Sequence, residues 1–137
     1  MAGTITQTVE SFGSRRDGNT MMKFVLTCTA DTVDGSFPLT TLGFTRALRG
    51  CRLEAMETDP GPVNPTASYD VTVTDDDGYD LLGGAGANRS ATNTERVLPI
   101  VASGIVGTVA VNGNTTINIT GNSVNSAQTT ITLFFSK

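Results

Sequence analysis

Histidine and tryptophan are absent from this chain of 137 residues, and lysine occurs only as Lys23 and Lys137. The absence of histidine removes the commonest general base and the commonest metal ligand, and it excludes Ser–His–Asp and Cys–His catalytic arrangements. The Gly-rich stretch 83–90 lacks the Gly-Lys-Ser/Thr ending of a phosphate loop and is interpreted as a flexible loop. The scarcity of aromatic residues also disfavours a carbohydrate-cleaving pair of carboxylates. We therefore expect no catalytic residue, no cofactor and no enzyme activity.

Charge is also scarce, and its balance is acidic, with a net charge of −4 and an isoelectric point near 4.6. A nucleic-acid partner normally requires a basic face, and a membrane-surface protein a polybasic patch, so we expect neither partner. No apolar run approaches the roughly 18 residues of a membrane span. The first residues have neither the basic nor the apolar region of a signal peptide. We expect synthesis and folding in a cytoplasm.

The chain has only two cysteines, Cys28 and Cys51, which are too few for a disulfide framework in a domain of this length. Without histidine they cannot form a zinc site alone. Each lies in an alternating segment, so we interpret both as buried thiols that pack as small apolar residues. A bridge between facing strands is the alternative.

Threonine, serine, asparagine and glycine are abundant instead. Threonine suits the exposed face of a strand, and asparagine and glycine suit tight turns. Short alternating segments recur between these turn signals, roughly every 8–12 residues. The pattern predicts an all-β protein, an antiparallel β-sandwich or barrel of about eight or nine short strands with no long helix. We expect residues 21–137 to form this one domain, and residues 1–20 to be an N-terminal arm or a first strand.

Alternation also predicts which side chains face the core. Three segments each place one set of side chains inward: Phe24, Leu26 and Cys28; Cys51, Leu53 and Ala55; Tyr69, Val71 and Val73. In the second segment the opposite face would carry Arg52, Glu54, Met56 and Thr58. Residues 68–84 predict a β-hairpin with an Asp-Asp-Asp-Gly turn, the Asn-Gly step at 112–113 predicts another hairpin turn, and residues 85–95 predict a flexible excursion.

The last residues change abruptly from a polar tract into the apolar segment TTITLFF. This segment is predicted to be the final strand, with Ile131, Leu133 and Phe135 on one face. Phe134 would then lie on the outer face, where a neighbouring subunit could cover it. Phe134 is therefore a candidate interface residue.

Four aspartates, Asp75, Asp76, Asp77 and Asp80, form the one acidic cluster with a metal-binding interpretation. Calcium favours several carboxylate oxygens on a tight turn. The spacing departs from the EF-hand loop, and adjacent residues of a strand point in different directions. A solvated hairpin tip is the favoured interpretation, and a structural cation is the weaker one.

Arginine outnumbers lysine, and Arg46, Arg49 and Arg52 lie close together in sequence. Arginine pairs with carboxylates in a bidentate manner and is enriched at protein interfaces. Two interpretations stay open: ion pairs within the chain, and a charged rim between subunits.

Three stretches together carry a resemblance to a known group of proteins: TADTVDGSFPLT at 29–40, the segment 53–95 from LEAMETDPGPV to ATNTE, and GNSVNSAQTTITLFF at 121–135. They resemble small proteins encoded among the virion structural genes of tailed bacteriophages and prophages. The resemblance covers most of the chain from about residue 22 onward and contains no chemical site. It implies a virion component without enzymatic activity.

The favoured candidate within this group is a capsid decoration (cement) protein, whose partners would be the major capsid protein and further copies of itself. Such proteins are usually homotrimers on the capsid surface, so the resemblance implies a location in the virion after synthesis in the bacterial host cytoplasm. The N-terminal arm could add a strand to the shell or to a neighbouring subunit. A head–tail connector or tail component that forms rings is the first alternative, and a carbohydrate- or receptor-binding β-module is the second.

Overall fold

The chain folds into antiparallel β-sheets in a computed structural model that describes residues 1–12, 21–43, 48 and 50–137. Eleven strands lie in the described residues: β1 (Thr4–Phe12), β2 (Met21–Thr29), β3 (Thr40–Thr41), β4 (Arg52–Pro60), β5 (Asp70–Thr74), β6 (Glu95–Val97), β7 (Ile100–Ala102), β8 (Ile105–Val106), β9 (Val109–Ala110), β10 (Thr116–Thr120) and β11 (Gln128–Ser136). Several of these strands have only two or three residues, which explains why the sequence predicts fewer.

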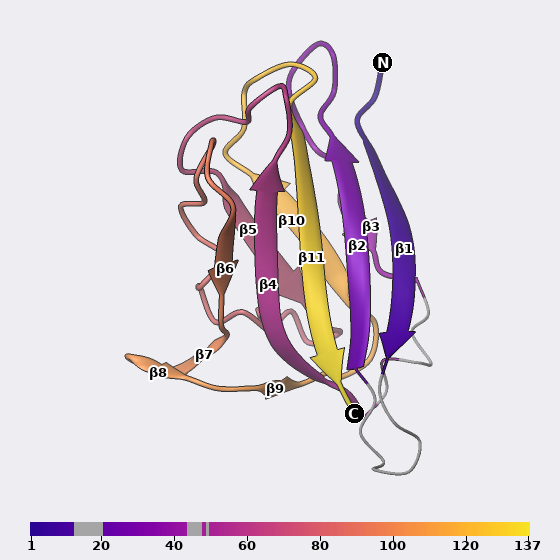
Figure 1. Cartoon of the computed structure of the whole chain (residues 1–137), viewed down its shortest axis with the longest axis vertical. Coiled ribbons are helices and arrows are strands. Elements are labelled where there is room, and N and C mark those ends of the chain that lie inside the picture. The colour runs from indigo at the N-terminus through magenta and orange to yellow at the C-terminus, as the bar shows by residue number, and fades with distance from the viewer. Residues whose placement is uncertain (13–20, 44–47, 49) are drawn as a thin grey trace.

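Two sheets pack against each other as a sandwich (Figure 1). The large sheet has the strand order β1-β2-β11-β4-β6, and β9 also pairs with β4. The small sheet has the order β3-β10-β5 and lies behind the large one in Figure 1. β7 and β8 form a separate two-stranded hairpin. The large sheet stays open between β1 and β6, so the predicted all-β sandwich is confirmed and the barrel alternative is not observed.

The core lies between the inward faces of the two sheets, where alternation places apolar side chains. Phe24, Leu26 and Cys28 of β2 are buried, as are Ile131, Leu133 and Phe135 of β11. The rings of Phe24 and Phe135 meet edge to face, with 5.4 Å between their centroids. From the small sheet, Tyr69, Val71 and Val73 with Ile117 and Ile119 complete this core. These predicted buried faces are therefore confirmed.

The middle of β4 departs from the predicted alternation. Phe134 lies opposite Ala55, but the next residue, Phe135, lies opposite Leu53, so Glu54 is an extra residue in β4. Such a β-bulge reverses the side on which later side chains point. Met56 and Thr58, predicted for the outer face, are consequently fully buried. Ala55, predicted to face the core, lies beside Phe134 on the outer face and is 8% exposed.

Two predicted hairpins are only partly right. The chain does reverse after β5, with a bridge between Thr74 and Asp80, but the ladder of β5 is formed with β10. Gly113 has the positive φ of 80° that the Asn-Gly step suggests. However, β9 before it pairs with β4 and β10 after it pairs with β5 and β3, so the step links the two sheets instead of closing a hairpin.

Of the two alternatives for the first residues, the structure has a first strand at Thr4–Phe12. β1 pairs with β2 through nine residues in unbroken antiparallel register. The amino group of Met1 donates to Thr32 Oγ1 at 2.7 Å, which ties the start of the chain to the loop after β2. Among the described residues, no helical segment has the length and hydrophobicity of a membrane span.

Candidate functional site

The acidic turn after β5 uses its carboxylates to hold the backbone. Asp75 Oδ1 accepts hydrogen bonds from the amides of Asp77, at 2.9 Å, and Tyr79, at 3.1 Å. Asp77 Oδ2 accepts from the Asn112 side chain at 2.7 Å. Aspartate favours turns because its oxygens satisfy nearby amides in this way. These carboxylates therefore tie the turn to the segment that precedes β10.

Asp80 accepts more hydrogen bonds from backbone amides than the other aspartates of this turn do. Its Oδ1 accepts from the amides of Val73 and Leu82, both at 3.1 Å, and its Oδ2 accepts from Gly84 at 2.9 Å. In the described part of the chain, no group of three or more carboxylates, thiols or imidazoles is arranged to hold a metal ion. The four metal candidates, Asp75, Asp76, Asp77 and Asp80, do not converge on such a site.

The arginine candidates can be placed only in part, because Arg46 and Arg49 lie outside the described residues. Arg52 is exposed at the start of β4, and its Nη1 donates to Thr108 Oγ1 at 3.4 Å. In the described ranges the two ion pairs are Arg89–Glu95 and Arg96–Glu57, and neither involves Arg52. Within the described residues, Arg52 is therefore an exposed side chain with one hydrogen bond and no ion pair.

Phe134 lies on the outer face of the large sheet, as predicted, but the chain itself covers part of its ring. Lys23 and Ala55 lie opposite it on the two neighbouring strands. The guanidinium carbon of Arg96 lies 4.8 Å from the ring centroid, which is the geometry of a cation–π contact. Arg96 Nη2 also bonds Glu57 Oε2 at 2.7 Å. Phe134 is therefore half-buried in the isolated chain. No pattern in the sequence predicted that Arg96 would cover this ring.

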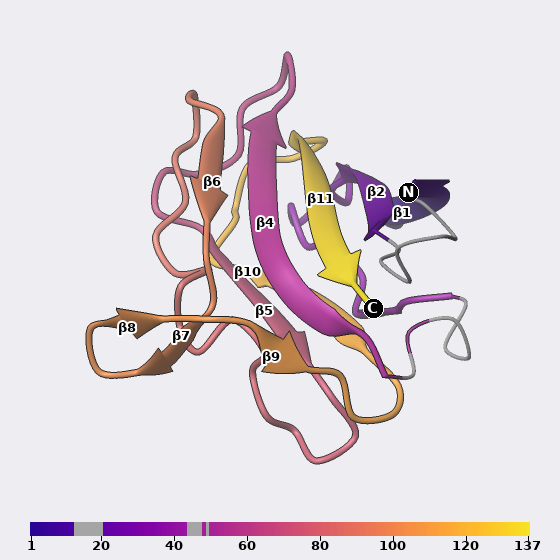
Figure 2. The same cartoon turned by 60° about the horizontal axis from the view of Figure 1, so that its bottom comes forward.

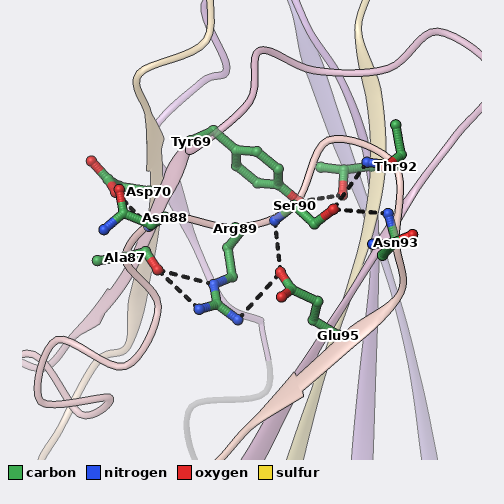
Figure 3. A network of polar contacts seen from close by, with 10 residues as sticks. Tyr69, Asp70, Ala87, Asn88, Arg89, Ser90, Thr92, Asn93 and Glu95 are labelled. Carbon is green, nitrogen blue, oxygen red and sulfur yellow. Dashed lines mark hydrogen bonds and ion pairs between the residues drawn. The ribbon is translucent and has the colours of Figure 1, made fainter.

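The segment 85–95, predicted to be flexible, is held by a polar network around Arg89 (Figure 3). The Arg89 guanidinium donates twice to the Ala87 carbonyl, at 3.2 and 2.9 Å, and lies 3.5 Å from Glu95 Oε1. The same Glu95 oxygen accepts from the Ser90 amide at 2.6 Å. Only 13% of the Arg89 side chain is exposed. These contacts anchor the predicted excursion at Arg89, Ser90 and Glu95.

This segment also covers the outer side of β5. The Arg89 amide donates to the Tyr69 carbonyl at 2.7 Å, and the Val71 amide donates to the Gly86 carbonyl at 2.9 Å. Asp70 Oδ1 accepts from the Asn88 amide at 2.9 Å. The polar segment therefore lies along the outer edge of β5, the edge strand of the small sheet, and forms hydrogen bonds with its backbone without being a regular strand.

Both cysteines are buried thiols, which confirms the favoured interpretation. Burial raises the pKa of the Cys28 thiol to about 12, because the thiolate would lose its hydration. Burial also raises the pKa of Cys51, although the charge of Lys137 opposes this effect. Nucleophilic and metal-binding cysteines react as thiolates. These two thiols therefore suit packing and not chemistry.

A shallow hollow of about 220 Å³ lies at one end of the large sheet. It is lined by residues 27–29 of β2, 128–130 of β11, and Gly61 and Pro62 after β4. Pockets that bind small molecules usually enclose about 300–1,000 Å³ and are predominantly apolar. This hollow is smaller, and most of its lining side chains carry hydroxyl or amide groups.

Among the described residues, exposed apolar side chains gather on and beside the hairpin of β7 and β8, which stands away from both sheets (Figures 1 and 2). Four large aliphatic side chains in residues 98–106 are between 44% and 58% exposed: Leu98, Val101, Ile105 and Val106. The sequence contains no charged residue between Arg96 and Lys137. Large exposed apolar patches on small proteins often mark interaction sites, so this hairpin is a candidate contact surface. Sequence reasoning did not single out these residues as a surface feature, because short apolar segments are also typical of buried strands.

No protein-family model matches the chain, and a search of curated proteins finds none similar to it.

Proposed function

We propose that this chain is a non-enzymatic structural protein of a tailed-bacteriophage virion, a capsid decoration protein that binds the outer surface of the major capsid shell. The resemblance of residues 29–40, 53–95 and 121–135 to phage virion proteins supports this assignment. The observation that carries it is the apolar hairpin of β7 and β8, because a protein that works by contact needs an exposed binding surface.

The proposed contact follows from the position of the hairpin. It emerges after β6, which is paired with β4 and therefore fixed to the large sheet. Ile105 and Val106 lie on β8 and are more than half exposed. Seating them against an apolar patch of the shell would remove them from water, which is favourable by about 25 cal/mol per Å² of buried apolar surface. Many copies on one shell would sum modest contacts into resistance against internal pressure.

The test is whether the protein binds to expanded phage capsids (heads) that lack it, which is measured by co-sedimentation. The wild-type chain is expected to pellet with the heads and to raise their melting temperature. The double variant Ile105→Asp/Val106→Asp is expected to lose this binding, because it would bring two charges to an apolar interface. Val33→Asp is the matched control, since Val33 is 78% exposed in a different turn.

The outcomes separate the assignments. Wild-type protein that forms rings and does not bind the heads would contradict the assignment as a decoration protein and would favour a head–tail connector or tail component. Binding to glycans without binding to heads would favour a receptor-binding module. A double variant that binds heads as well as the wild type would show that the hairpin is not the contact.

A further inference from the structure

In the part of the chain that the structure describes, the first strand forms one long edge of the large sheet and has no partner strand on its outer side. β1 contributes nine residues, from Thr4 to Phe12, and within the described residues β2 is the only strand that pairs with it. The register runs from Thr4 opposite Thr29 to Phe12 opposite Met21 without a bulge. An edge strand of this kind presents unpaired amide and carbonyl groups, which are satisfied by a further strand.

The other edges of the two sheets are short or covered. β6, β9 and β3 have only two or three residues each. The long edge of β5 is covered by its own chain: Val73 N donates to Asp80 Oδ1, Leu81 N to the Val73 carbonyl, and Val71 N to the Gly86 carbonyl. β1 is therefore the one long edge that the described chain does not protect.

β1 also lacks the devices that usually prevent edge pairing. Its sequence TITQTVESF contains no proline, lysine or arginine, and its only charged residue is Glu10, which lies opposite Lys23 of β2. The strand is held in place, because Gln7 Oε1 accepts from the Gly43 amide at 2.8 Å and Gln7 Nε2 donates to the Thr41 carbonyl at 3.1 Å. The edge presented to solvent therefore carries a single charged residue and is fixed at Gln7.

We propose that β1 pairs with β1 of a second copy of this chain, antiparallel and about a two-fold axis at Gln7. Residues 4–10 of the two copies would then form one ladder that joins the two large sheets. Ile5 of each copy would face Val9 of the other, and Thr6 would face Thr8. Glu10 would face Thr4, so no like charges meet.

The composition of β1 selects this register. Ile5 and Val9 point toward the core and are only partly buried, so an apolar neighbour would complete their burial. Moving the axis to Thr8 would place Ile5 opposite Ser11 and Val9 opposite Gln7, which separates the apolar pair. A two-fold contact of this kind is closed, because the β1 edge of each copy is fully used by the other copy. The pairing does not depend on the virion assignment.

Sedimentation equilibrium of the purified full chain tests the pairing. The wild type is expected to be a dimer. Thr6→Lys/Thr8→Lys and Thr6→Glu/Thr8→Glu would each place like charges opposite each other, which should raise the dissociation constant about tenfold. A mixture of the two variants should recover the dimer, because Lys then faces Glu.

The control and the register need separate variants. Thr27→Lys alters an exposed threonine on the same sheet face, one strand inward, and should leave the dimer unchanged. For the register, Thr6→Cys and Thr8→Cys proteins should each give little cross-linked dimer alone and abundant disulfide-linked dimer when mixed. A monomeric wild type, or a dimer or trimer that the Lys and Glu variants leave intact, would overturn the proposal. Equal cross-linking by each Cys variant alone would overturn the register.

Discussion

Individual aspartates of the turn after β5 accept hydrogen bonds from backbone amides, and Asp80 accepts the largest number. Its two oxygens bind the amides of Val73, Leu82 and Gly84, which lie on both sides of the chain reversal. An amide that loses its partner at a partly buried site carries a cost in desolvation. Asp80 therefore anchors the turn through its hydrogen bonds to these three amides.

Asp80→Ala is expected to lower the free energy of unfolding by about 1–3 kcal/mol, because three amides lose their acceptor. Urea denaturation followed by circular dichroism measures this change. Asp77→Ala is the control: Asp77 is exposed and accepts one side-chain hydrogen bond, from Asn112, so its loss should stay within about 0.5 kcal/mol. Equal effects of the two substitutions would contradict the anchoring role of Asp80.

At the scale of the strand, the bulge at Glu54 decides which side chains of β4 enter the core. Leu53 faces Phe135 before the bulge, and Met56 faces Leu133 after it, so both ends of β4 contribute to the same side of the sheet. Strict alternation predicts Met56 at the surface, because nothing in the letters RLEAMET marks an inserted residue. Register irregularities depend on the partner strand, which the sequence of one strand does not reveal.

Met56→Ala is expected to cost about 2–5 kcal/mol of unfolding free energy, as for other truncations of buried side chains. The reason is that Met56 is fully buried despite its place in the predicted outer set. Arg52→Ala, an exposed position of the same predicted set, should change stability by less than about 0.5 kcal/mol. Thermal or urea unfolding of both variants measures the difference. A negligible effect of Met56→Ala would contradict the bulge.

The strands with regular alternation were predictable, and the contacts between distant segments were not. β2, β5 and β11 place the expected side chains in the core, because a buried face needs an apolar residue at every second position. The cover of Phe134 by Arg96 joins residues far apart in sequence, whereas the contacts of Arg89 with Ala87 and Glu95 depend on the local conformation of the loop. The polar, Gly-rich composition of residues 85–95 predicted a flexible loop. Composition alone does not show which backbone amides of such a segment form hydrogen bonds.

At the scale of the whole molecule, the sandwich combines a covered interior with two surfaces suited to contacts. One is the apolar hairpin of β7 and β8 (Figure 2), and the other is the bare edge of β1. Local turn signals predicted the all-β class of the fold but fewer strands than the structure has, and they did not predict the order β1-β2-β11-β4-β6, which brings the last strand into the middle of the sheet. That arrangement explains why Phe134 and Phe135 lie so near the end of the sequence: β11 is flanked on both sides by long strands.

The proposed role is tested most directly by locating the protein in intact virions of a phage that encodes it. Immunogold electron microscopy, with an antibody raised against the purified chain, measures this position. The proposal predicts gold particles distributed over the surface of the head, and none on heads from a phage in which the gene is deleted. Label confined to the neck or the tail, or virions without label, would contradict the assignment as a capsid decoration protein.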